Sequence, residues 1–182
     1  MKLIIGLGNI GKEYENTRHN IGWLYLDYLS KKYNFEFNKE KHYSMITDYV
    51  NINDSKVIFA KPTTYMNLSG KAVLALMNWY KIDVEDILII YDDIDIMFGE
   101  VRYKKNSSAG THNGMKNIVQ TISTNNIPRI KLGIGGIKYK EQPLCDFVLS
   151  RFSKEENDKL LDIFSAADEK FNDFLDKAKN KC

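Results

Sequence analysis

Short apolar runs alternate with amphipathic stretches along the whole chain. Runs of four or five apolar residues that end at glycine, proline or acidic residues are typical of buried strands. Together with two alternating segments, they predict strands over residues 2–6, 45–51, 56–60, 87–90, 101–105 and 129–134. Apolar residues at helical spacing predict helices over residues 20–33, 68–80 and 114–124 and from residue 153 onward. This order predicts an α/β fold in which one domain, residues 1–182, has a twisted mixed sheet with helices on both faces.

Two local signals sharpen this prediction. Asn53 and Asp54 separate two predicted strands, which favours a hairpin turn at these residues. Ser153 and Glu156 have the spacing of a capping box, which predicts the start of the last helix.

Composition limits the class of protein. The 182 residues are 43% hydrophobic and 27% charged, as in ordinary soluble proteins. No apolar run approaches the roughly 20 residues that span a bilayer, and the short N-terminal run does not resemble a signal peptide. With Cys145 and the last residue, Cys182, as the only cysteines, we expect neither a disulfide framework nor a cysteine metal cluster. A cytoplasmic protein without membrane association is expected.

Positive charge is concentrated in one segment. Residues 99–140 contain eight lysines and arginines and one acid, Glu100, so this segment carries +7 and the rest of the chain −5. The basic residues are Arg102, Lys104, Lys105, Lys116, Arg129, Lys131, Lys138 and Lys140. Such a segment is typical of a phosphate-binding surface, although charge alone equally fits a solvated lysine-rich surface.

A glycine motif follows the first predicted strand. Gly6-Leu7-Gly8-Asn9-Ile10-Gly11 fits the G-x-G-x-x-G pattern of dinucleotide-binding proteins. Its surroundings do not fit, because Lys12 to Asn20 lacks the apolar stripe of the required helix. The ribose-binding acid is also missing, since Asp27 lies within a helical pattern and Glu36 is a loose match. We therefore expect no nucleotide cofactor.

Amide and imidazole side chains recur at the predicted strand and helix ends. Asn9, Asn67 and Asn113 each lie at such a junction, as do His19 and His112. Asparagines there commonly act as helix caps or turn formers. Taken together with a histidine, the amides also fit a site that binds a carbonyl oxygen and a water molecule.

His19 is the candidate general base, because imidazole titrates near neutral pH. Asp92, directly after a buried strand, is placed to accept a ring N–H and orient the imidazole. Asp92, Asp93 and Asp95 are also potential metal ligands, but histidines with the spacing of a metalloprotease are absent, so no metal is expected. Without a serine or cysteine in a nucleophile-elbow setting, direct attack by water is the expected chemistry.

Five ordered motifs resemble the bacterial-type peptidyl-tRNA hydrolases across nearly the whole chain. They are residues 6–22 (GLGNIGKEYENTRHNIG), 61–70 (KPTTYMNLSG), 92–95 (DDID), 109–114 (AGTHNG) and 129–135 (RIKLGIG). The resemblance implies a monomeric, metal-independent esterase that recycles tRNA by cleaving the bond between a peptide and the tRNA 3′ end. The expected partner is peptidyl-tRNA, held by its acceptor stem and 3′ CCA end.

The resemblance also implies a role for each matching residue. His19 corresponds to the catalytic base, Asp92 to its orienting partner, and Asn9 and Asn113 to catalytic amides that line the site. The substrate-binding positions are Tyr14, Met66, Asn67 and His112, with His112 near the terminal nucleotide. Lys104 and Lys131 correspond to a pair that holds the 5′-phosphate of the tRNA.

Four residues depart from the family pattern. Ile10 replaces a proline, Ser107 and Thr111 stand where glycine is common, and Lys131 stands where arginine is frequent. The base and its partner are intact, so we expect activity with altered tRNA affinity and a stiffer loop around residues 107–111. Three alternatives remain: a catalytically silent RNA-binding protein of this fold, a dinucleotide-binding protein, and a general esterase that needs no tRNA.

Overall fold

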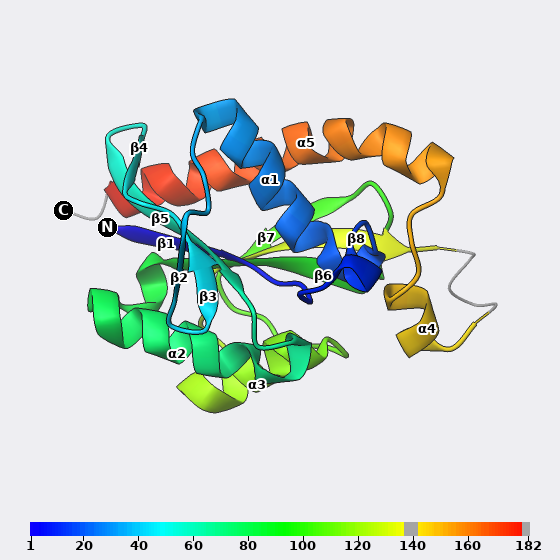
Figure 1. Ribbon diagram of the computed structural model, residues 1–182, viewed down its shortest axis with the longest axis horizontal. Helices are drawn as coiled ribbons and strands as arrows, with labels where there is room; N and C mark the ends of the chain where they lie inside the picture. Colours follow the sequence, from blue (N-terminus) through cyan, green and yellow to red (C-terminus); the bar gives the residue numbers. More distant parts are fainter. Residues whose placement is uncertain (137–141, 180–182) are drawn as a thin grey trace.

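The computed structural model describes residues 1–136 and 142–179, which build one eight-stranded mixed sheet (Figure 1). The strand order is β2-β3-β5-β1-β6-β8-β7, and β4 pairs with β5 beside this path. Strands β1, β5, β6 and β8 run parallel to one another, whereas β2, β3, β4 and β7 are antiparallel to their neighbours. The strands are β1 (Lys2–Gly6), β2 (Lys39–Lys41), β3 (Ser44–Ile46), β4 (Val50–Ile52), β5 (Ser55–Pro62), β6 (Ile87–Met97), β7 (Val101–Lys104) and β8 (Arg129–Gly135).

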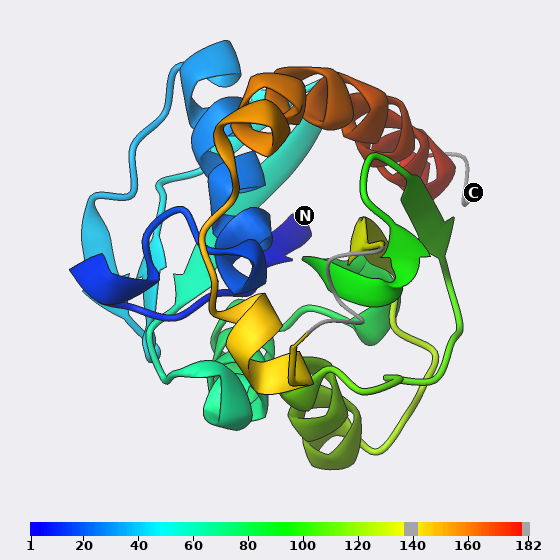
Figure 2. The same cartoon turned by 90° about the vertical axis from the view of Figure 1, so that its right-hand side faces the viewer.

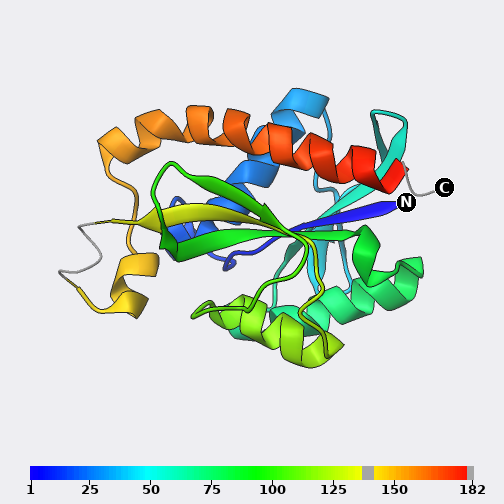
Figure 3. The same ribbon diagram turned by 180° about the vertical axis from the view of Figure 1, so that it is seen from behind.

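Helices cover both faces of the sheet, as the strand and helix order predicts. Helices α1 (Ile21–Tyr33) and α5 (Lys154–Lys179) pack on one face, and α2 (Ser69–Tyr80) and α3 (Asn113–Ile122) pack on the other (Figures 1 and 3). The short α4 (Leu144–Val148) lies beyond the end of the sheet, nearest the viewer in Figure 2. Within the described residues there are also four 3-10 helices: η1 (Lys12–Tyr14), η2 (Arg18–Asn20), η3 (Met66–Leu68) and η4 (Val84–Asp86). The architecture is therefore α/β.

Each face of the sheet has its own apolar core, because side chains alternate along a strand. On β6, Leu88 and Ile90 pack under α1 and α5, whereas Ile87 and Ile89 pack under α2 and α3. A polar cluster also ties α1 to α5. The hydroxyls of Tyr25 and Tyr28 each donate to the Asp168 carboxylate at 2.7 Å.

Most predicted elements are present, with small shifts at their ends. Asn53 and Asp54 form the predicted β4–β5 turn, both with left-handed φ angles of 51° and 63°. The Ser153 capping box is also confirmed: the Glu156 N–H donates to Ser153 Oγ at 3.2 Å, and the Ser153 N–H donates to Glu156 Oε1 at 2.9 Å.

The single strand predicted over residues 45–51 is wrong. It is divided into β3 and β4, because the Thr47 hydroxyl interrupts the strand pairing: the Phe59 N–H donates to Thr47 Oγ1 at 3.1 Å. The strand predicted over residues 87–90 is too short, since β6 continues through the acidic residues to Met97 by pairing with β8.

Helix α4 was not predicted at all. It has only five residues, too few for an apolar repeat to be recognised in the sequence.

Among the described helices, none is long and apolar enough to cross a membrane.

The connections at the centre of the sheet determine where a site can form. After β1 the chain leaves through α1 toward β3 and β5, whereas after β6 it leaves toward β8. The carboxyl end of β1 at Gly6 therefore lies beside Ile90 in the middle of β6, where the connections diverge, the usual place for a ligand site in an open α/β sheet. Helix α1 packs closely against these two strands at Gly22, where a Cβ atom would lie 2.4 Å from the Ile90 carbonyl oxygen.

Candidate active site

A cavity of about 520 Å³ opens beyond the carboxyl end of β1, beside Tyr91 to Ile94 of β6. Its walls come from the segments that follow β1, β5 and β7, from β6 itself and from α4. The lining includes Asn9, Tyr14, His19, Met66, Asn67, Asp92, His112 and Asn113, eight of the ten residues predicted for the site. The other two, Lys104 and Lys131, lie outside the cavity wall.

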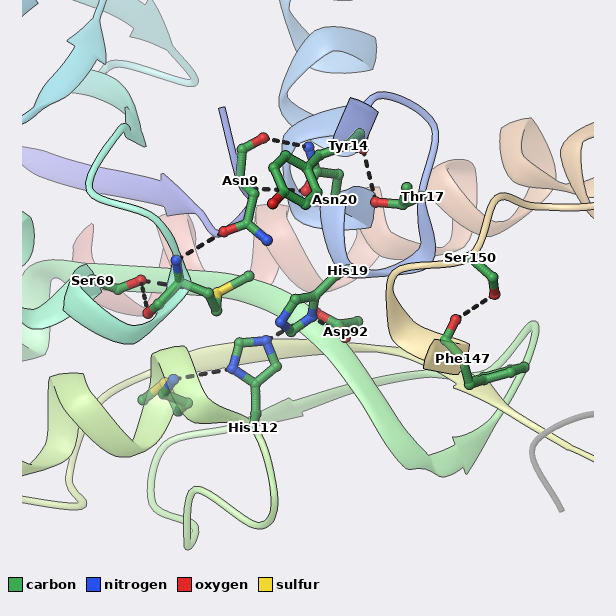
Figure 4. Close-up of polar contacts among 12 residues, drawn as sticks. Asn9, Tyr14, Thr17, His19, Asn20, Ser69, Asp92, His112, Phe147 and Ser150 are labelled. Carbon is green, nitrogen blue, oxygen red and sulfur yellow. Dashed lines mark hydrogen bonds and ion pairs between the residues drawn. The ribbon is translucent and has the colours of Figure 1, made fainter. Parts of the chain in front are cut away.

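The centre of the site is a buried carboxylate held by two imidazoles (Figure 4). His19 Nδ1 lies 2.8 Å from Asp92 Oδ2, and His112 Nε2 lies 2.9 Å from Asp92 Oδ1. The two rings are 4.8 Å apart between centroids. Because an ionised carboxylate only accepts hydrogen bonds, each of these ring nitrogens carries the proton that it donates to Asp92.

The remaining ring nitrogens have different surroundings. His112 Nδ1 accepts the Met115 N–H at 3.0 Å, so His112 is neutral with both nitrogens occupied. His19 Nδ1 donates to Asp92, which leaves the Nε2 lone pair of a neutral His19 for another partner. The sequence therefore identified His19 and Asp92 as a pair, but it did not reveal His112 as the second donor to Asp92.

The pKa values of the two histidines are shifted in opposite directions. Burial lowers the pKa of His19, but the charge and hydrogen bond of Asp92 outweigh burial and raise this pKa above 6.5. Burial dominates at His112 and lowers its pKa below 6.5 despite the same carboxylate. Burial raises the pKa of Asp92, and the two imidazoles more than offset that effect and lower it well below its usual range. Asp92 is thus an anion at neutral pH.

Asn9 points an amide N–H₂ group toward His19, as Figure 4 shows. Its Oδ1 accepts the Met66 N–H at 2.8 Å, which fixes the orientation of the amide. Asn20 holds the backbone of Asn9 from the other side, with its Oδ1 accepting the Asn9 N–H at 2.8 Å and its Nδ2 donating to the Asn9 carbonyl oxygen at 2.9 Å. The Asn9 Nδ2 group is a hydrogen-bond donor fixed at the cavity wall.

Asn67 and Asn113 are exposed at the cavity and make no side-chain hydrogen bond within the described part of the chain. The capping interpretation of these asparagines is wrong. Leu68 occupies the N-cap position of α2, and His112 caps α3 by accepting the Met115 N–H. Both amides are consequently free to bind a ligand.

The cavity mouth is aromatic and one wall is apolar. The rings of Tyr14 and Tyr65 meet edge to face, with centroids 6.3 Å apart. The wall that sequence reasoning missed comes from α4 and the residue after it: Leu144, Cys145, Val148 and Leu149. Tyr65, in contrast to the four residues of this wall, had a sequence signal, because it lies within the motif of residues 61–70.

Arg18, next to His19, anchors the segment that contains α4. Its guanidinium donates to Ser150 Oγ at 2.5 Å and to the Arg151 carbonyl oxygen at 2.7 Å, and it pairs with Glu156 Oε1 at 2.6 Å. It also stacks on the Phe147 ring at 4.5 Å. The apolar wall and the histidine are therefore held by adjacent residues.

The basic segment is less exposed than its charge predicts. Arg129 is fully buried and donates to carbonyl oxygens of Ile127 and Asn125, so its assignment to a charged surface is wrong. Lys104 is exposed at the end of β7. Lys138 and Lys140 lie outside the described residues.

Lys131 is partly neutralised by its neighbours. Its ammonium donates to Ser107 Oγ at 2.8 Å and lies 3.7 Å from Asp93 Oδ2. Burial lowers the pKa of Lys131, and Asp93 offsets this only in part. The departure to serine at position 107 thus supplies a hydrogen-bond partner for this lysine.

Two kinds of cofactor site can be compared with the geometry. His19, Asp92 and His112 offer ligand atoms within 4.8 Å of one another, which is compatible in distance with a bound cation. The ring nitrogens that face Asp92 are its hydrogen-bond donors, so a cation there would have to replace both bonds. The glycine motif lacks the helix of a dinucleotide fold, because η1 and η2 follow β1 and α1 begins only at Ile21.

Comparison with known proteins gives one consistent result. The family model described as peptidyl-tRNA hydrolase matches residues 3–182. A peptidyl-tRNA hydrolase of Clostridium botulinum is 46% identical over 158 residues, which cover 87% of this chain and 82% of that protein. One from Mycoplasma mycoides is 45% identical over 174 residues, covering 96% of this chain and 92% of that protein.

A solved structure is similar as well. The crystal structure of peptidyl-tRNA hydrolase from Acinetobacter baumannii superimposes with a TM-score of 0.81 at 36% identity. The match covers 89% of this chain and 81% of that chain.

The two histidines are expected to titrate in a fixed order. Monitored by histidine NMR as the pH falls, His19 should gain its proton first, above pH 6.5, and His112 only below it. Asp92→Asn, which removes the charge and keeps the burial, should lower the pKa of His19. Since the pKa of His19 is raised by folding, its contribution to the free energy of unfolding is present below about pH 6.5 and is lost as pH rises through the folded pKa. Protonation of His112 before His19 would contradict this assignment.

Proposed function

The chain belongs to the peptidyl-tRNA hydrolase family, and from this premise we propose how its residues hydrolyse the ester that joins a peptide to tRNA. The observation that carries the proposal is His19, held at 2.8 Å by the buried Asp92 carboxylate with its Nε2 lone pair available at a cavity. The proposed biological role is the recycling of tRNA from prematurely released peptidyl-tRNA, by a monomer in the cytoplasm.

His19 acts as the general base. Its Nε2 accepts a proton from a water molecule while the water oxygen bonds to the ester carbonyl carbon. The carbonyl π electrons move to oxygen, and the resulting intermediate collapses by breaking the bond to the ribose oxygen. That oxygen leaves with the proton held by His19, giving a free ribose hydroxyl and a peptide carboxylic acid, which then releases its proton to solvent as a carboxylate. Asp92 stabilises the imidazolium that forms between these steps.

The oxyanion is stabilised by amide donors. Asn9 Nδ2 faces His19, and its orientation is fixed before substrate binds because Oδ1 is held by the Met66 N–H. Asn113, at the first position of α3, provides a second free amide. Donors fixed in this way stabilise developing charge without the cost of reorientation.

The peptide lies between the aromatic mouth and the apolar wall. Asn67 Nδ2 donates to the carbonyl oxygen of the group that blocks the α-nitrogen, an acceptor that a substrate with a free α-ammonium lacks. Tyr14 and Met66 contact the peptide and the 3′ end of the tRNA. With both ring nitrogens occupied, His112 meets the terminal nucleotide only through carbon atoms of its ring.

The tRNA acceptor stem is held by charge. Lys104 is exposed and binds the 5′-phosphate, while Lys131 joins it after releasing part of its contact with Asp93. Phosphate contacts position the duplex, and the 3′ CCA end then reaches the cavity. This requirement for tRNA separates the proposed enzyme from a general esterase.

Replacement of the base tests the mechanism. With N-acetylated aminoacyl-tRNA in EDTA, the wild type should turn over, and His19→Ala should lower kcat by at least about 10²-fold, because general base catalysis is lost. Leu161→Ala, on the exposed face of α5 and away from the cavity, is the control and should retain activity. Wild-type tRNA binding without turnover would instead identify a silent RNA-binding protein, and activity lost in EDTA would identify a required metal.

Asn9→Asp tests the oxyanion donor. Aspartate keeps the acceptor for the Met66 N–H but replaces the Nδ2 donor by a carboxylate oxygen, so kcat should fall by about 10²- to 10³-fold with little change in KM. Asn78→Asp, on the exposed side of α2, controls for the added charge. A kcat within about threefold of wild type would rule out this role for Asn9.

Lys104→Ala tests the phosphate contact. KM for the tRNA substrate should rise while kcat is retained, and the slope of log affinity against log salt should become less steep by about 0.7–0.9. Lys159→Ala, an exposed lysine on α5, is the matched control. An unchanged salt dependence in Lys104→Ala would contradict the proposed contact.

A further inference from the structure

An exposed aromatic surface begins at the cavity mouth and runs along α2. It consists of Leu68, Lys71 and Trp79 from η3 and α2, together with His42 and Tyr43 from the turn between β2 and β3, and is called the α2–hairpin surface below. Leu68, Trp79 and Tyr43 are 50%, 64% and 51% exposed. Figure 1 shows the β2–β3 hairpin against α2.

Direct contacts make this surface continuous. Lys71 Nζ lies 4.4 Å from the centre of the Tyr43 ring, and the His42 and Trp79 rings are 4.8 Å apart between centroids. Lys71 and Trp79 are about 2.2 turns apart on α2 at about 3.6 residues per turn, so they lie on one stripe about a quarter of a turn wide, and Leu68 of η3 precedes it.

The surface is also joined to the cavity. The Thr63 N–H donates to the Tyr43 carbonyl oxygen at 2.8 Å, and Tyr65, two residues further, forms the cavity mouth with Tyr14. The turn that contains Tyr43 is therefore linked to the cavity lining through the backbone of residues 63–65.

The backbone of this region is strained at ring-bearing residues. His42 and Tyr43 occupy the two turn positions with φ angles of 55° and 60°, and Tyr65 has a φ of 62°. The neighbouring β4–β5 turn uses Asn53 and Asp54, residue types that tolerate this conformation. Tyr43 and Tyr65 are both exposed, so their left-handed backbone does not serve to bury their rings in the core. Backbone strain of this kind is typical of functional sites.

The location of the α2–hairpin surface favours a peptide as its ligand. The basic residues Lys104 and Lys131 lie on β7 and β8, at the opposite edge of the sheet from β2 and β3 (Figures 1 and 3). If tRNA enters from the β7 edge, the peptide leaves the cavity toward the β3 edge. One lysine among aromatic and aliphatic groups suits an extended peptide better than a phosphate backbone.

We propose that the α2–hairpin surface binds the part of the peptide beyond the residue esterified to tRNA. This proposal rests on the proposed function. From Leu68 to Trp79 the stripe is about 16 Å long at about 1.5 Å per residue, which matches about five residues of extended peptide at about 3.3 Å each. Aromatic rings and the Lys71 ammonium contact apolar side chains and peptide carbonyl oxygens of many sequences, as a nascent chain of variable sequence requires.

The test compares two substrates of one tRNA. One carries a single N-acetylated residue, and the other an N-acetylated peptide of about six residues, long enough to cover the stripe. For the wild type, kcat/KM should be several-fold higher for the long substrate. Trp79→Ala should abolish most or all of that preference, through KM, and leave the short substrate unaffected, because truncating an aromatic contact that binding buries removes an effect of at least this size.

Controls separate this surface from other effects. Tyr43→Gly removes a second ring while suiting the left-handed turn, so it should fold and show the same loss. Leu161→Ala, 68% exposed on α5, should not change the preference.

Three outcomes would overturn the proposal: no length preference in the wild type, an unchanged preference in both surface variants, or equal losses for the two substrates with weaker binding of deacylated tRNA. The last would make the surface an RNA contact. Loss of all turnover in His19→Ala with both substrates bears only on the proposed mechanism, whereas a wild type that cleaves neither substrate refutes the proposed function itself.

Discussion

The site depends on one buried anion. The carboxylate of Asp92 has two oxygens, and each receives an N–H from a different histidine at 2.8 and 2.9 Å. Burying an ionised carboxylate costs free energy unless both of its oxygens are hydrogen-bonded. Both imidazoles are therefore needed to keep Asp92 buried and charged. The two histidines nevertheless differ, because His112 has its second nitrogen bound to the Met115 N–H whereas His19 has its second nitrogen available. The same carboxylate thus holds one histidine with an available ring nitrogen and one with both ring nitrogens hydrogen-bonded.

Sheet topology explains how distant segments reach this anion. His19 follows β1, Asp92 lies within the neighbouring strand β6, and His112 precedes α3 in the segment that follows β7. The rest of the cavity is added by elements that are short or irregular: η1, η3 and α4. The regular core fixes His19, Asp92 and His112, and the irregular segments shape the cavity beside them.

The sequence predicted the regular parts well, because apolar periodicity reports burial directly. Strand β1 and the capping box at Ser153 were both predicted correctly. The acidic residues after Ile90 suggested a loop, but β6 continues through them, since pairing with β8 is independent of side-chain charge.

Sequence reasoning failed where tertiary contacts decide. The charge pattern places Arg129 on the surface, but its side chain is buried and donates to backbone carbonyl oxygens. His112 rather than Asn113 caps α3, and no local pattern separates these adjacent residues. The pairing of His19 with Asp92 was inferred from residue types and their predicted positions, whereas the apolar wall from α4 had no periodic signal.

The cap on α3 has a consequence for acid tolerance. His112 holds the first turn of this helix only through an unprotonated Nδ1, and burial lowers its pKa in the folded protein. The unfolded chain binds a proton at this residue more readily than the folded chain, so acid favours unfolding as pH falls below about 6.5. Acid tolerance is therefore partly a property of the architecture: the proton that occupies the available nitrogen of His19 and the proton that releases α3 bind to rings that share one carboxylate.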